Sequence, residues 1–547
     1  MSRRTIDGRL FSKMLEGGAA SLALHIQEIN DLNVFPVADG DTGTNMARTI
    51  NGGVSAVSGI DDESISAISA GFAKGVLLSA RGNSGVILSQ IFAGIAAGIG
   101  DKAEADAREL AVAYKQGVER AYASVQNPTE GTILTVFRES AQFAADNIDD
   151  SSSVEDFFRL HVEEGMRSLL HTKEILPVLA ESDVVDSGGA GYMYIAEGMY
   201  QTLMGKAPTA SLDLTSTKEQ NDVDIDGFTR DSVLEFGYCT EFLLRLTTAK
   251  CDPDSFEVST LISELEALGG ESIVAYKTED IVKVHVHTFT PGSVFSEAQK
   301  YGEFLTVKVE NMSIGHSGTP VKKAKTNKSF SVLAVATGDG LSALFTDMGA
   351  DRIISGGQTA NPSIEEFIEA FKACDTEHII VLPNNKNVIL AARQAASLYE
   401  GAKVHIIETK SLMQGYSALS VITPGIKDMD ALCRSAEMAA EGVTGIEVTR
   451  AVRDVTLGGF DISEGDYIAI TDGQINAVAD TAENTAMAAL AEVDTDLCEM
   501  ITIFTGKGID EERRVAFVAA VEEEYPDCEV TVYKGGQEVY DYMLALE

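Results

Sequence analysis

Apolar residues recur at helical spacing through the first 205 residues of the chain. Two stripes each share one helical face: Ile65, Ile68, Phe72 and Val76, and then Leu110, Tyr114, Val118 and Tyr122. Helical runs also fit 133–148, 154–171 and 189–204, and no stretch here alternates convincingly with period two. We therefore predict an all-helical bundle or barrel over 1–205, followed by a polar linker over 206–227.

The pattern becomes strand-like after that linker. Strands fit 242–246, 271–276, 281–287 and 305–309, and helices fit 255–268 and 293–302. The resulting order is strand, helix, strand, strand, helix, strand, which is the split-βαβ arrangement. We expect a small α+β domain over 228–318, and a second linker with four lysines over 319–329.

From residue 330 onward, short apolar runs alternate with helical segments. The runs SVLAVATG, DRIISGG, HIIVLP and KVHIIET are of the buried parallel type. Helices fit the intervening and following stretches 363–373, 387–399, 427–441, 481–491 and 510–523. This alternation predicts a doubly wound α/β region over 330–547, built as one or two lobes.

The amino-acid composition is that of a large globular protein, and its net charge excludes some classes of binding partner. The 547 residues carry 42 Lys plus Arg and 84 Asp plus Glu, which gives a formal net charge of −42. Such a charge repels nucleic acid and anionic membranes. The sequence contains no run of about 18 uninterrupted apolar residues, so we expect no membrane-spanning helix. Its six cysteines are scattered and include no CxxC pair. We expect a cytoplasmic protein that binds no nucleic acid.

The densest polar cluster is the segment 33–45, NVFPVADGDTGTN. Asp39 and Asp41 stand two residues apart in a glycine-flanked loop that leads into a helix. Magnesium is typically held by one or two carboxylates together with substrate phosphates, and a helix N-terminus offers free N–H groups to phosphate. An Asp-Gly turn followed by a helix cap explains this loop alone about equally well.

Three further loops place small residues before a helix: 79–85 (SARGNSG), 128–132 (PTEGT) and 186–191 (DSGGAG). In a helical bundle such N-termini can gather at one rim and bind a nucleotide together. The alternative is that each is merely a capped loop. Neither a GxxxxGK[ST] nor a GxGxxG sequence occurs, so a nucleotide site here would be of another type.

The motifs NVFPVADGDTGTNM, SARGNSGVILSQIF, NPTEGTILTVFRESA and VVDSGGAGY resemble the L-subunit domain of dihydroxyacetone kinases. From about residue 7 to its end, the chain resembles the ATP-binding subunit of bacterial fatty acid kinase. The resemblance implies that the helical domain binds ATP or ADP with two Mg²⁺ ions, and that Asp39 and Asp41 are the catalytic metal ligands. It places these residues around the nucleotide: Thr44, Asn45, Ser84, Gly85, Thr132, Asp186 and Gly188. The kinase pattern has a third, upstream aspartate, where this chain offers only Asn33 at a different spacing.

A second candidate metal site lies in the middle domain, in the segment 281–287 (IVKVHVH). If the valines face the core, His285 and His287 project together on the other face, roughly 7 Å apart. With Cys239 they would give three zinc ligands and an open fourth position. From the residues alone, a solvated polar face with a small buried cysteine is the more common arrangement. The resemblance implies a metal, most simply Zn²⁺, at these three positions, with His316 as a further ligand or none.

In the C-terminal region, the loops 356–363 and 383–387 follow strands and open helices, where α/β folds bind ligands. Plain turn chemistry explains both loops equally well. The region resembles the DegV-type fatty-acid-binding proteins, which implies a docking region for such a carrier and no second lipid pocket. The basic segment 449–454 could bind an acidic patch or phosphate, but pairing with neighbouring carboxylates is the more common outcome.

The resemblance implies ATP-dependent phosphorylation of a fatty acid carboxylate, presented by a separate carrier protein to a homodimeric kinase. The products would be ADP and an acyl phosphate for phospholipid synthesis. A carboxylate is ionised near pH 7, so the transfer needs no general base. Two alternatives remain: phosphotransfer to a small hydroxy-ketone, for which no candidate base lies near the acidic loop, and a nonenzymatic ADP-binding scaffold or regulator. Nucleotide turnover separates the scaffold from the kinase.

Overall fold

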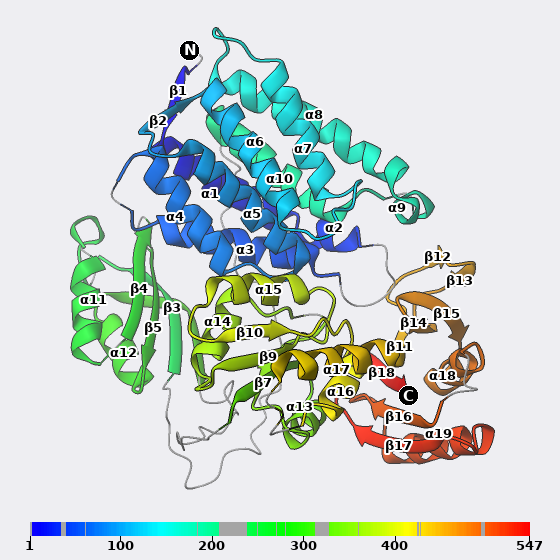
Figure 1. The fold of residues 1–547 in the computed structure, drawn as a ribbon. Coiled ribbons are helices and arrows are strands. Elements are labelled where there is room, and N and C mark those ends of the chain that lie inside the picture. Colours follow the sequence, from blue (N-terminus) through cyan, green and yellow to red (C-terminus); the bar gives the residue numbers. More distant parts are fainter. Residues whose placement is uncertain are drawn as a thin grey trace. The chain divides into compact units, whose positions relative to one another are not determined.

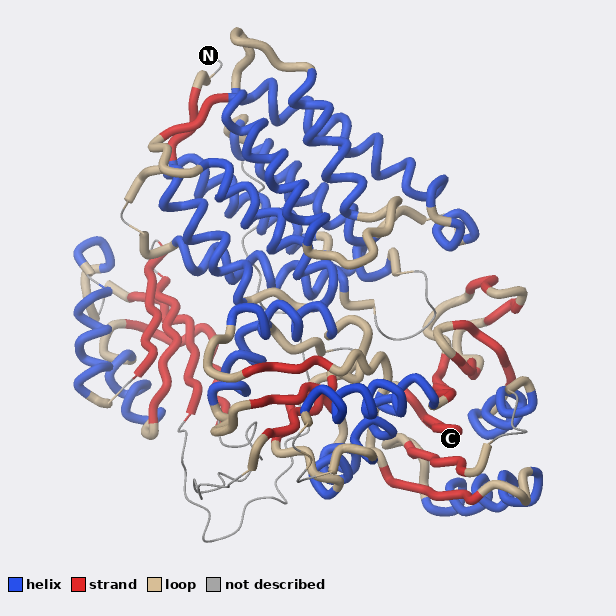
Figure 2. Tube along the Cα trace, in the orientation of Figure 1, coloured by secondary structure: helices blue, strands red, loops and turns tan. Residues whose placement is uncertain are grey.

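The computed structural model describes 3–33, 40–60, 62–182, 184–206, 238–248, 250–256, 258–269, 271–278, 281–311, 328–358, 360–423, 426, 428–493 and 498–547. The chain divides into two compact units. Met1–Asp213 and Lys325–Glu547 together form one unit, and Leu214–Ala324 forms the other. Figure 1 shows the elements in chain order, and Figure 2 shows helices and strands by colour.

The N-terminal part of the first unit is helical, as predicted (Figure 2). Its helices are α1 (Gly8–Leu24), α2 (Ile26–Asp31), α3 (Thr42–Val57), α4 (Ile65–Leu78), α5 (Gly82–Ile99), α6 (Ala107–Ala123), α7 (Ile133–Asp146), α8 (Val154–Ile175), α9 (Pro177–Glu181) and α10 (Ser187–Leu203). The structure also contains a short antiparallel strand pair, β1 (Thr5–Asp7) with β2 (Glu104–Asp106). The sequence pattern did not predict it. The first predicted stripe, on α4, is fully buried in the core of this domain.

Helix α5 is mostly apolar, and neighbouring helices bury most of its residues. By length and composition alone it could cross a membrane, but 67% of that window is buried inside the domain. Two glycines bring α5 and α6 into close contact. A Cβ atom on Gly94 would lie 2.5 Å from the Gln116 carbonyl oxygen, and one on Gly98 would lie 2.4 Å from the Cα atom of Ala113. These positions therefore need glycine.

The second unit has the strand and helix order that the pattern predicts. Its elements are β3 (Tyr238–Leu246), a 3₁₀ turn (Pro253–Ser255), α11 (Val258–Ala267), β4 (Glu271–Thr278), β5 (Ile281–Thr288), α12 (Pro291–Ala298) and β6 (Gly302–Asn311). The antiparallel sheet has the order β4-β5-β3-β6. Val282, Val284 and Val286 are fully buried in its core, as expected. The alternating residues of β6 are instead half exposed, since Val307 keeps 50% of its surface accessible.

The C-terminal part of the first unit contains two different sheets. The first lobe consists of β7 (Phe330–Ala336), α13 (Asp339–Asp347), β8 (Arg352–Ser355), α14 (Ile364–Lys372), β9 (His378–Leu382), α15 (Ile389–Leu398) and β10 (Lys403–Ile406). Its sheet is parallel throughout, in the order β10-β9-β7-β8. Here the doubly wound expectation agrees with the structure.

The second lobe departs from that expectation, because its sheet is mixed. After α16 (Leu412–Ser420) and α17 (Met429–Gly442) come β11 (Thr444–Arg450), β12 (Val455–Leu457), β13 (Phe460–Ile462), β14 (Tyr467–Thr471), β15 (Gln474–Ala479), α18 (Ala482–Ala491), β16 (Met500–Thr505), α19 (Glu511–Glu524), β17 (Glu529–Lys534) and β18 (Tyr540–Leu546). The sheet order is β15-β14-β11-β18-β16-β17, and only β16 and β17 pair in parallel. Asp472 and Gly473 both have positive φ, as a tight hairpin turn between β14 and β15 requires.

His161 is a fully buried histidine at the centre of the helical domain. Its ring packs against Tyr114, Phe137 and Phe157. Nε2 lies 2.7 Å from the Tyr192 hydroxyl oxygen, and Nδ1 has no partner among the described residues. Burial lowers the pKa of His161 to about 4, because desolvation penalises the charged imidazolium. The histidine is therefore neutral near pH 7.

We predict that His161 makes the helical domain acid-sensitive. His161 binds a proton near pH 6.5 in the unfolded chain but only near pH 4 in the folded chain. The free energy of unfolding is therefore unaffected by this group above pH 6.5, and it falls by about 3 kcal/mol as the pH is lowered toward 4. Thermal midpoints measured from pH 7.5 to 4.5 should fall less steeply in His161→Phe than in the wild type. His171→Phe, which changes an exposed histidine, is the control. An unchanged pH slope in His161→Phe would contradict this account.

Candidate functional site

Helix N-termini of the helical domain meet around one cavity of about 470 Å³. Residues at the N-terminal ends of α5, α7 and α10, including helix caps, line one side of the cavity: Asn83, Ser84, Ile87, Thr132, Ile133, Leu134, Asp186, Ser187 and Gly188. The Ser187 hydroxyl lies 3.4 Å from the Thr42 hydroxyl oxygen, so the start of α3 adjoins the same place. The predicted gathering of N-termini at one rim is therefore present. Side chains already cap N–H groups in the first turns of α3, α7 and α10, whereas α5 has no side-chain cap, so the start of α5 offers uncapped N–H groups to an anion.

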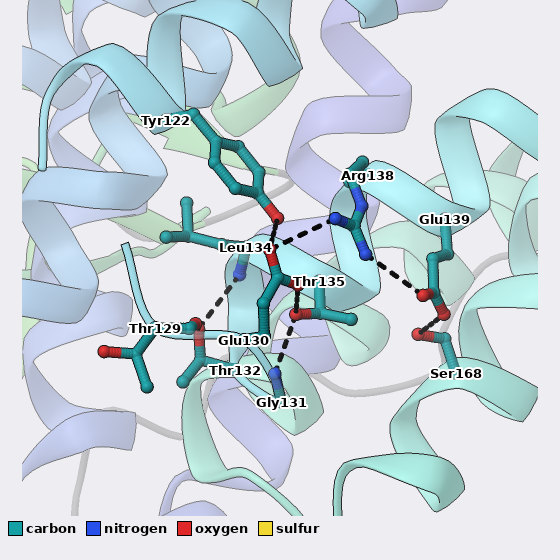
Figure 3. A network of polar contacts seen from close by, with 10 residues as sticks. All are labelled: Tyr122, Thr129, Glu130, Gly131, Thr132, Leu134, Thr135, Arg138, Glu139 and Ser168. Carbon is teal, nitrogen blue, oxygen red and sulfur yellow. Dashed lines mark hydrogen bonds and ion pairs between the residues drawn. The ribbon is translucent and has the colours of Figure 1, made fainter. Parts of the chain in front are cut away.

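The loop before α7 is fixed by a network of polar contacts around Glu130 (Figure 3). Its carboxylate accepts hydrogen bonds from Tyr122 Oη (3.1 Å), Thr135 Oγ1 (2.6 Å) and Arg138 Nη1 (3.1 Å). The Gly131 N–H donates to Thr135 Oγ1 at 2.8 Å. This network leaves the loop little freedom and presents Thr132, the N-cap of α7, at the edge of the cavity.

Asp186 caps α10 at the same cavity. Its Oδ2 accepts a hydrogen bond from the Gly189 N–H at 2.7 Å, and its own N–H donates to Thr172 Oγ1. Burial raises the pKa of Asp186 to about 6, although bonds from the backbone N–H groups of Gly189 and Ile133 oppose the rise. The surroundings of Asp186 in the folded protein therefore disfavour its ionised form, and such raised carboxyl pKa values are common in binding sites.

Asp41 occupies the N-cap position of α3 without capping the helix. That task falls to Asn30, whose Oδ1 accepts hydrogen bonds from the N–H groups of Gly43 (2.8 Å) and Thr44 (3.3 Å). The Asp41 carboxylate instead accepts a hydrogen bond from the side-chain amide of Asn361, at 2.7 Å, from the C-terminal region. Asp39 lies outside the described residues.

The residues around Asp41 fit a hard divalent cation. Asn361 is 1% exposed, and its Oδ1 is buried without a hydrogen-bond partner among the described residues. Asp41 and Asn361 thus bring carboxylate and amide oxygens together, which are the ligand types that Mg²⁺ takes. The described part of the chain contains no group of three or more His, Cys, Asp or Glu side chains placed to share a metal. A magnesium site here would need Asp39, phosphate oxygens or water as further ligands.

Of the seven predicted nucleotide residues, Ser84, Thr132, Asp186 and Gly188 line the cavity, and Thr44, Asn45 and Gly85 do not. The Thr44 hydroxyl accepts a bond from Asn30 Nδ2, and Asn45 is buried beside Gly82. A Cβ atom on Gly85 would lie 2.5 Å from Thr49 Oγ1, so this glycine allows α3 and α5 to approach.

The C-terminal region forms the other side of the cavity. Lys386, in the candidate ligand loop 383–387, lines it, but the sequence did not predict that this region shares a site with the helical domain. Its lining residues are Lys386, Ile389, Leu390, Arg393, Glu408 and Lys410. Arg393 pairs with Glu408 and donates to the Gln126 side chain at 3.1 Å, and Asn83 donates to Asn387 at 3.3 Å. Glu408 thus compensates the charge of Arg393, and Lys386 and Lys410 are the lining residues that add positive charge on this side, which suits an anionic ligand.

Two other C-terminal segments that the sequence singled out, loop 356–363 and the basic segment 449–454, have no described residue among those that line this cavity. A small cavity of about 60 Å³ lies between loop 356–360 and Tyr540, with room for about two water molecules. In the basic segment, the Arg450 guanidinium stacks on the Tyr467 ring, 4.9 Å from its centre. Arg453 donates to the main-chain carbonyl of Asp31 at 2.8 Å. The predicted pairing with carboxylates is thus replaced in these contacts by an aromatic ring and a backbone carbonyl.

In the second unit, the strand register relates two of the predicted metal ligands. Position 239 on β3 lies directly opposite position 287 on β5, and position 285 lies opposite 241. Directly opposite residues of an antiparallel pair lie on the same face of the sheet. The side chains of Cys239, His285 and His287, and all of His316, lie outside the described residues.

Comparison with known proteins finds relatives along the whole chain. Residues 36–201 match the DAK2 domain, and 235–319 and 331–547 match the middle and C-terminal domains of the FakA-like fatty acid kinase family. Protein YloV of Bacillus subtilis is 37% identical over 563 residues, with 100% of both chains covered. An uncharacterized protein of Staphylococcus haemolyticus, SH1689, is 36% identical over 555 residues and 99% of both chains.

Likeness to solved structures is weaker. Dihydroxyacetone kinase from C. freundii, solved with AMP-PNP and Mg²⁺, has 14% identity and a TM-score of 0.28, with 37% of this chain and 35% of that chain covered. The Streptococcus pneumoniae fatty acid kinase B3 protein, loaded with linoleic acid, has 11% identity and a TM-score of 0.28, with 40% and 99% covered.

We predict that Asp186→Asn stabilises the ligand-free protein. The raised pKa means that ionisation opposes folding as pH rises from the unfolded value near 4 through about 6. An amide of the same shape keeps the Gly189 cap and removes that charge, so it should add about 1 to 3 kcal/mol at pH 7.5 and little at pH 4. Thermal midpoints at both pH values test this. A lower midpoint than wild type at pH 7.5 would refute it.

Proposed function

Because this chain belongs to the FakA-like fatty acid kinase family, we propose that it phosphorylates a fatty acid carboxylate with ATP. A separate fatty-acid-binding protein of the DegV type would present the acid, and the products would be acyl phosphate, for phospholipid synthesis, and ADP. The observation that carries this proposal is the cavity at the meeting of the α5, α7 and α10 N-termini. Its volume is in the range of small-molecule sites, and anions bind well at helix N-termini.

The residues of the site fit phosphoryl transfer to a carboxylate. Asp39 and Asp41 would hold two Mg²⁺ ions, which when bound neutralise the charge of the phosphates. Ser84 on α5, Thr132 at the start of α7 and Gly188 on α10 line the cavity, where backbone N–H groups at the helix starts would bind the phosphates. Lys386 and Lys410 add positive charge from the C-terminal side. Positioning and charge are sufficient in principle, because an ionised carboxylate needs no base to attack.

The C-terminal region would bind the carrier. The cavity beside Tyr540, of about 60 Å³, is too small for an acyl chain. By family resemblance we extend the proposal to a cytoplasmic homodimer. Transfer to a hydroxy-ketone and a nonenzymatic ADP-binding scaffold are the competing functions, and a transfer assay distinguishes all three.

Loss of the acidic pair should abolish the reaction. With Mg²⁺, ATP and a fatty-acid-loaded carrier of the DegV type, the full chain should form ADP and acyl phosphate in equal amounts. Asp41→Ala and Asp39→Ala should lower the rate at least about 100-fold, because each removes charge stabilisation of the transition state. Acyl phosphate is followed by transfer of the labelled γ-phosphate from ATP, and ADP is measured in the same sample.

Asp150→Ala is the matched control. Asp150 lies beyond the C-terminal end of α7, the end opposite the cavity, and its exposed carboxylate forms a surface ion pair with Arg108. It should react at the wild-type rate. Full activity in Asp41→Ala and Asp39→Ala would refute the assignment. ADP binding without transfer from any carrier would favour the scaffold, and transfer to dihydroxyacetone would favour the hydroxy-ketone kinase.

We propose in addition that Cys239, His285 and His287 bind Zn²⁺ in the middle domain. The support is the antiparallel register, in which positions 239 and 287 are direct cross-strand neighbours and 285 is two residues away on the same strand. Thiolate and imidazole ligands suit zinc.

Metal analysis by mass spectrometry should then find about one zinc per purified wild-type chain. Cys239→Ser and His287→Ala should each lower the zinc content several-fold, because three protein ligands become two. Cys251→Ser, a cysteine of the same unit whose thiol donates to the Tyr301 carbonyl, is the control and should retain zinc. Equal zinc in all four proteins would exclude a site at these residues.

A further inference from the structure

Asn361 joins two parts of the chain that are 320 residues apart in sequence. It lies in the loop between β8 and α14, and its side chain reaches the carboxylate of Asp41 at the start of α3. Its main-chain carbonyl accepts a bond from Arg81 Nη1 at 2.9 Å. A Cβ atom on Gly82 would lie 3.5 Å from Asn361 Nδ2, so the asparagine is also close to the start of α5.

The loop that carries Asn361 is firmly attached to the turn between α4 and α5. The Ile364 N–H donates to the Ala80 carbonyl at 3.3 Å, and Arg81 pairs with Glu366 at 3.0 Å. Ala80 and Val86 belong to the same buried apolar cluster as Ile364 and Phe367. Burial of this kind is worth more than an exposed ion pair. The position of Asn361 relative to Asp41 is therefore set by packing.

The hydrogen bond from Asn361 to Asp41 is of the kind by which a neighbouring residue orients a metal-binding side chain without touching the metal. A hydrogen bond to one carboxylate oxygen fixes the orientation in which the carboxylate offers its other lone pairs. An amide is neutral, so it orients Asp41 without the charge competition that lysine or arginine would bring. The amide oxygen of Asn361 is buried without a partner among the described residues, and because it belongs to the same amide group, it too lies near the carboxylate. A buried polar atom without a partner is costly, and a water molecule bound to the cation would satisfy it.

From these contacts we propose that Asn361 is a positioning residue of the metal site in the helical domain. The C-terminal region, through this one side chain, orients Asp41 and completes the site for the metal–nucleotide complex. The inference rests on the proposed function, since it takes Asp41 as a metal ligand. It goes further in assigning part of the site to a region that the family resemblance gives only to carrier docking. Displacement of loop 356–363 would then weaken metal binding directly.

The test measures binding of Mn²⁺, as a probe for Mg²⁺, to the full chain in the presence of ADP, by the electron paramagnetic resonance signal of free Mn²⁺. Asn361→Ala should bind Mn²⁺ about 10- to 100-fold more weakly than wild type. ADP affinity measured in EDTA should not change, because the side chain acts on the metal ligand and not on the nucleotide. In an Asp41→Ala background, Asn361→Ala should cause no further loss.

Two more variants make the result decisive. Asn361→Ser keeps a hydrogen-bond donor and should lose less Mn²⁺ affinity than Asn361→Ala, so it replaces that variant if the alanine chain fails to fold. Asn476→Ala is the matched control, since Asn476 lies on β15 in the same region and also has a buried oxygen without a described partner. It should bind Mn²⁺ within twofold of wild type.

Each contrary outcome has a separate meaning. If Asp41→Ala loses Mn²⁺ while Asn361→Ala stays within twofold of wild type, the positioning role is wrong and the metal assignment stands. A parallel loss of metal-free ADP affinity in Asn361→Ala would reduce Asn361 to a structural residue and overturn the proposal. If wild type and Asp41→Ala bind Mn²⁺ equally, the metal assignment itself fails, and the inference fails with it.

Discussion

The apolar contact between the α4–α5 turn and the first C-terminal sheet is the constraint on which the candidate site depends. Ala80 and Val86 are buried in one cluster with residues of β7, β9, α14 and α15. This cluster brings the loops after β8 and β9 up to the N-terminal ends of the helices. Without it, the cavity would be a rim of helix ends open on one side, and Asp41 would lack its amide partner.

The same contact explains why the site has two kinds of chemistry. The helical side supplies N–H groups, hydroxyls and carboxylates, because four loops of small and polar residues end there at helix starts. The C-terminal side supplies Lys386, Arg393 and Lys410, in a chain whose net charge is −42. Local positive charge within an acidic surface can bind an anionic nucleotide while the long-range field still repels nucleic acid.

Local patterns were enough to predict the elements of this site. Glycine and cap residues before α5, α7 and α10 marked three helix starts, and apolar stripes marked the buried faces, because both signals act within one or two turns. The second C-terminal lobe shows the limit of such patterns. Short apolar strands look alike in parallel and antiparallel sheets, and the hairpin signals were limited to two short turns, Gly458-Gly459 and Asp472-Gly473. Contacts between distant segments had no local signal, so neither Asn361 beside Asp41 nor Asn30 as the cap of α3 was predictable.

A crystal structure of the full chain with AMP-PNP and Mg²⁺ would test the central claim most directly. Our account predicts the phosphates at the starts of α5 and α10, with an Asp41 oxygen about 2.1 Å from a magnesium ion. It also predicts that Asn361 remains bonded to the same carboxylate and that Lys386 or Lys410 faces the nucleotide. A nucleotide bound elsewhere, or an Asp41 side chain turned away from the metal, would contradict the account.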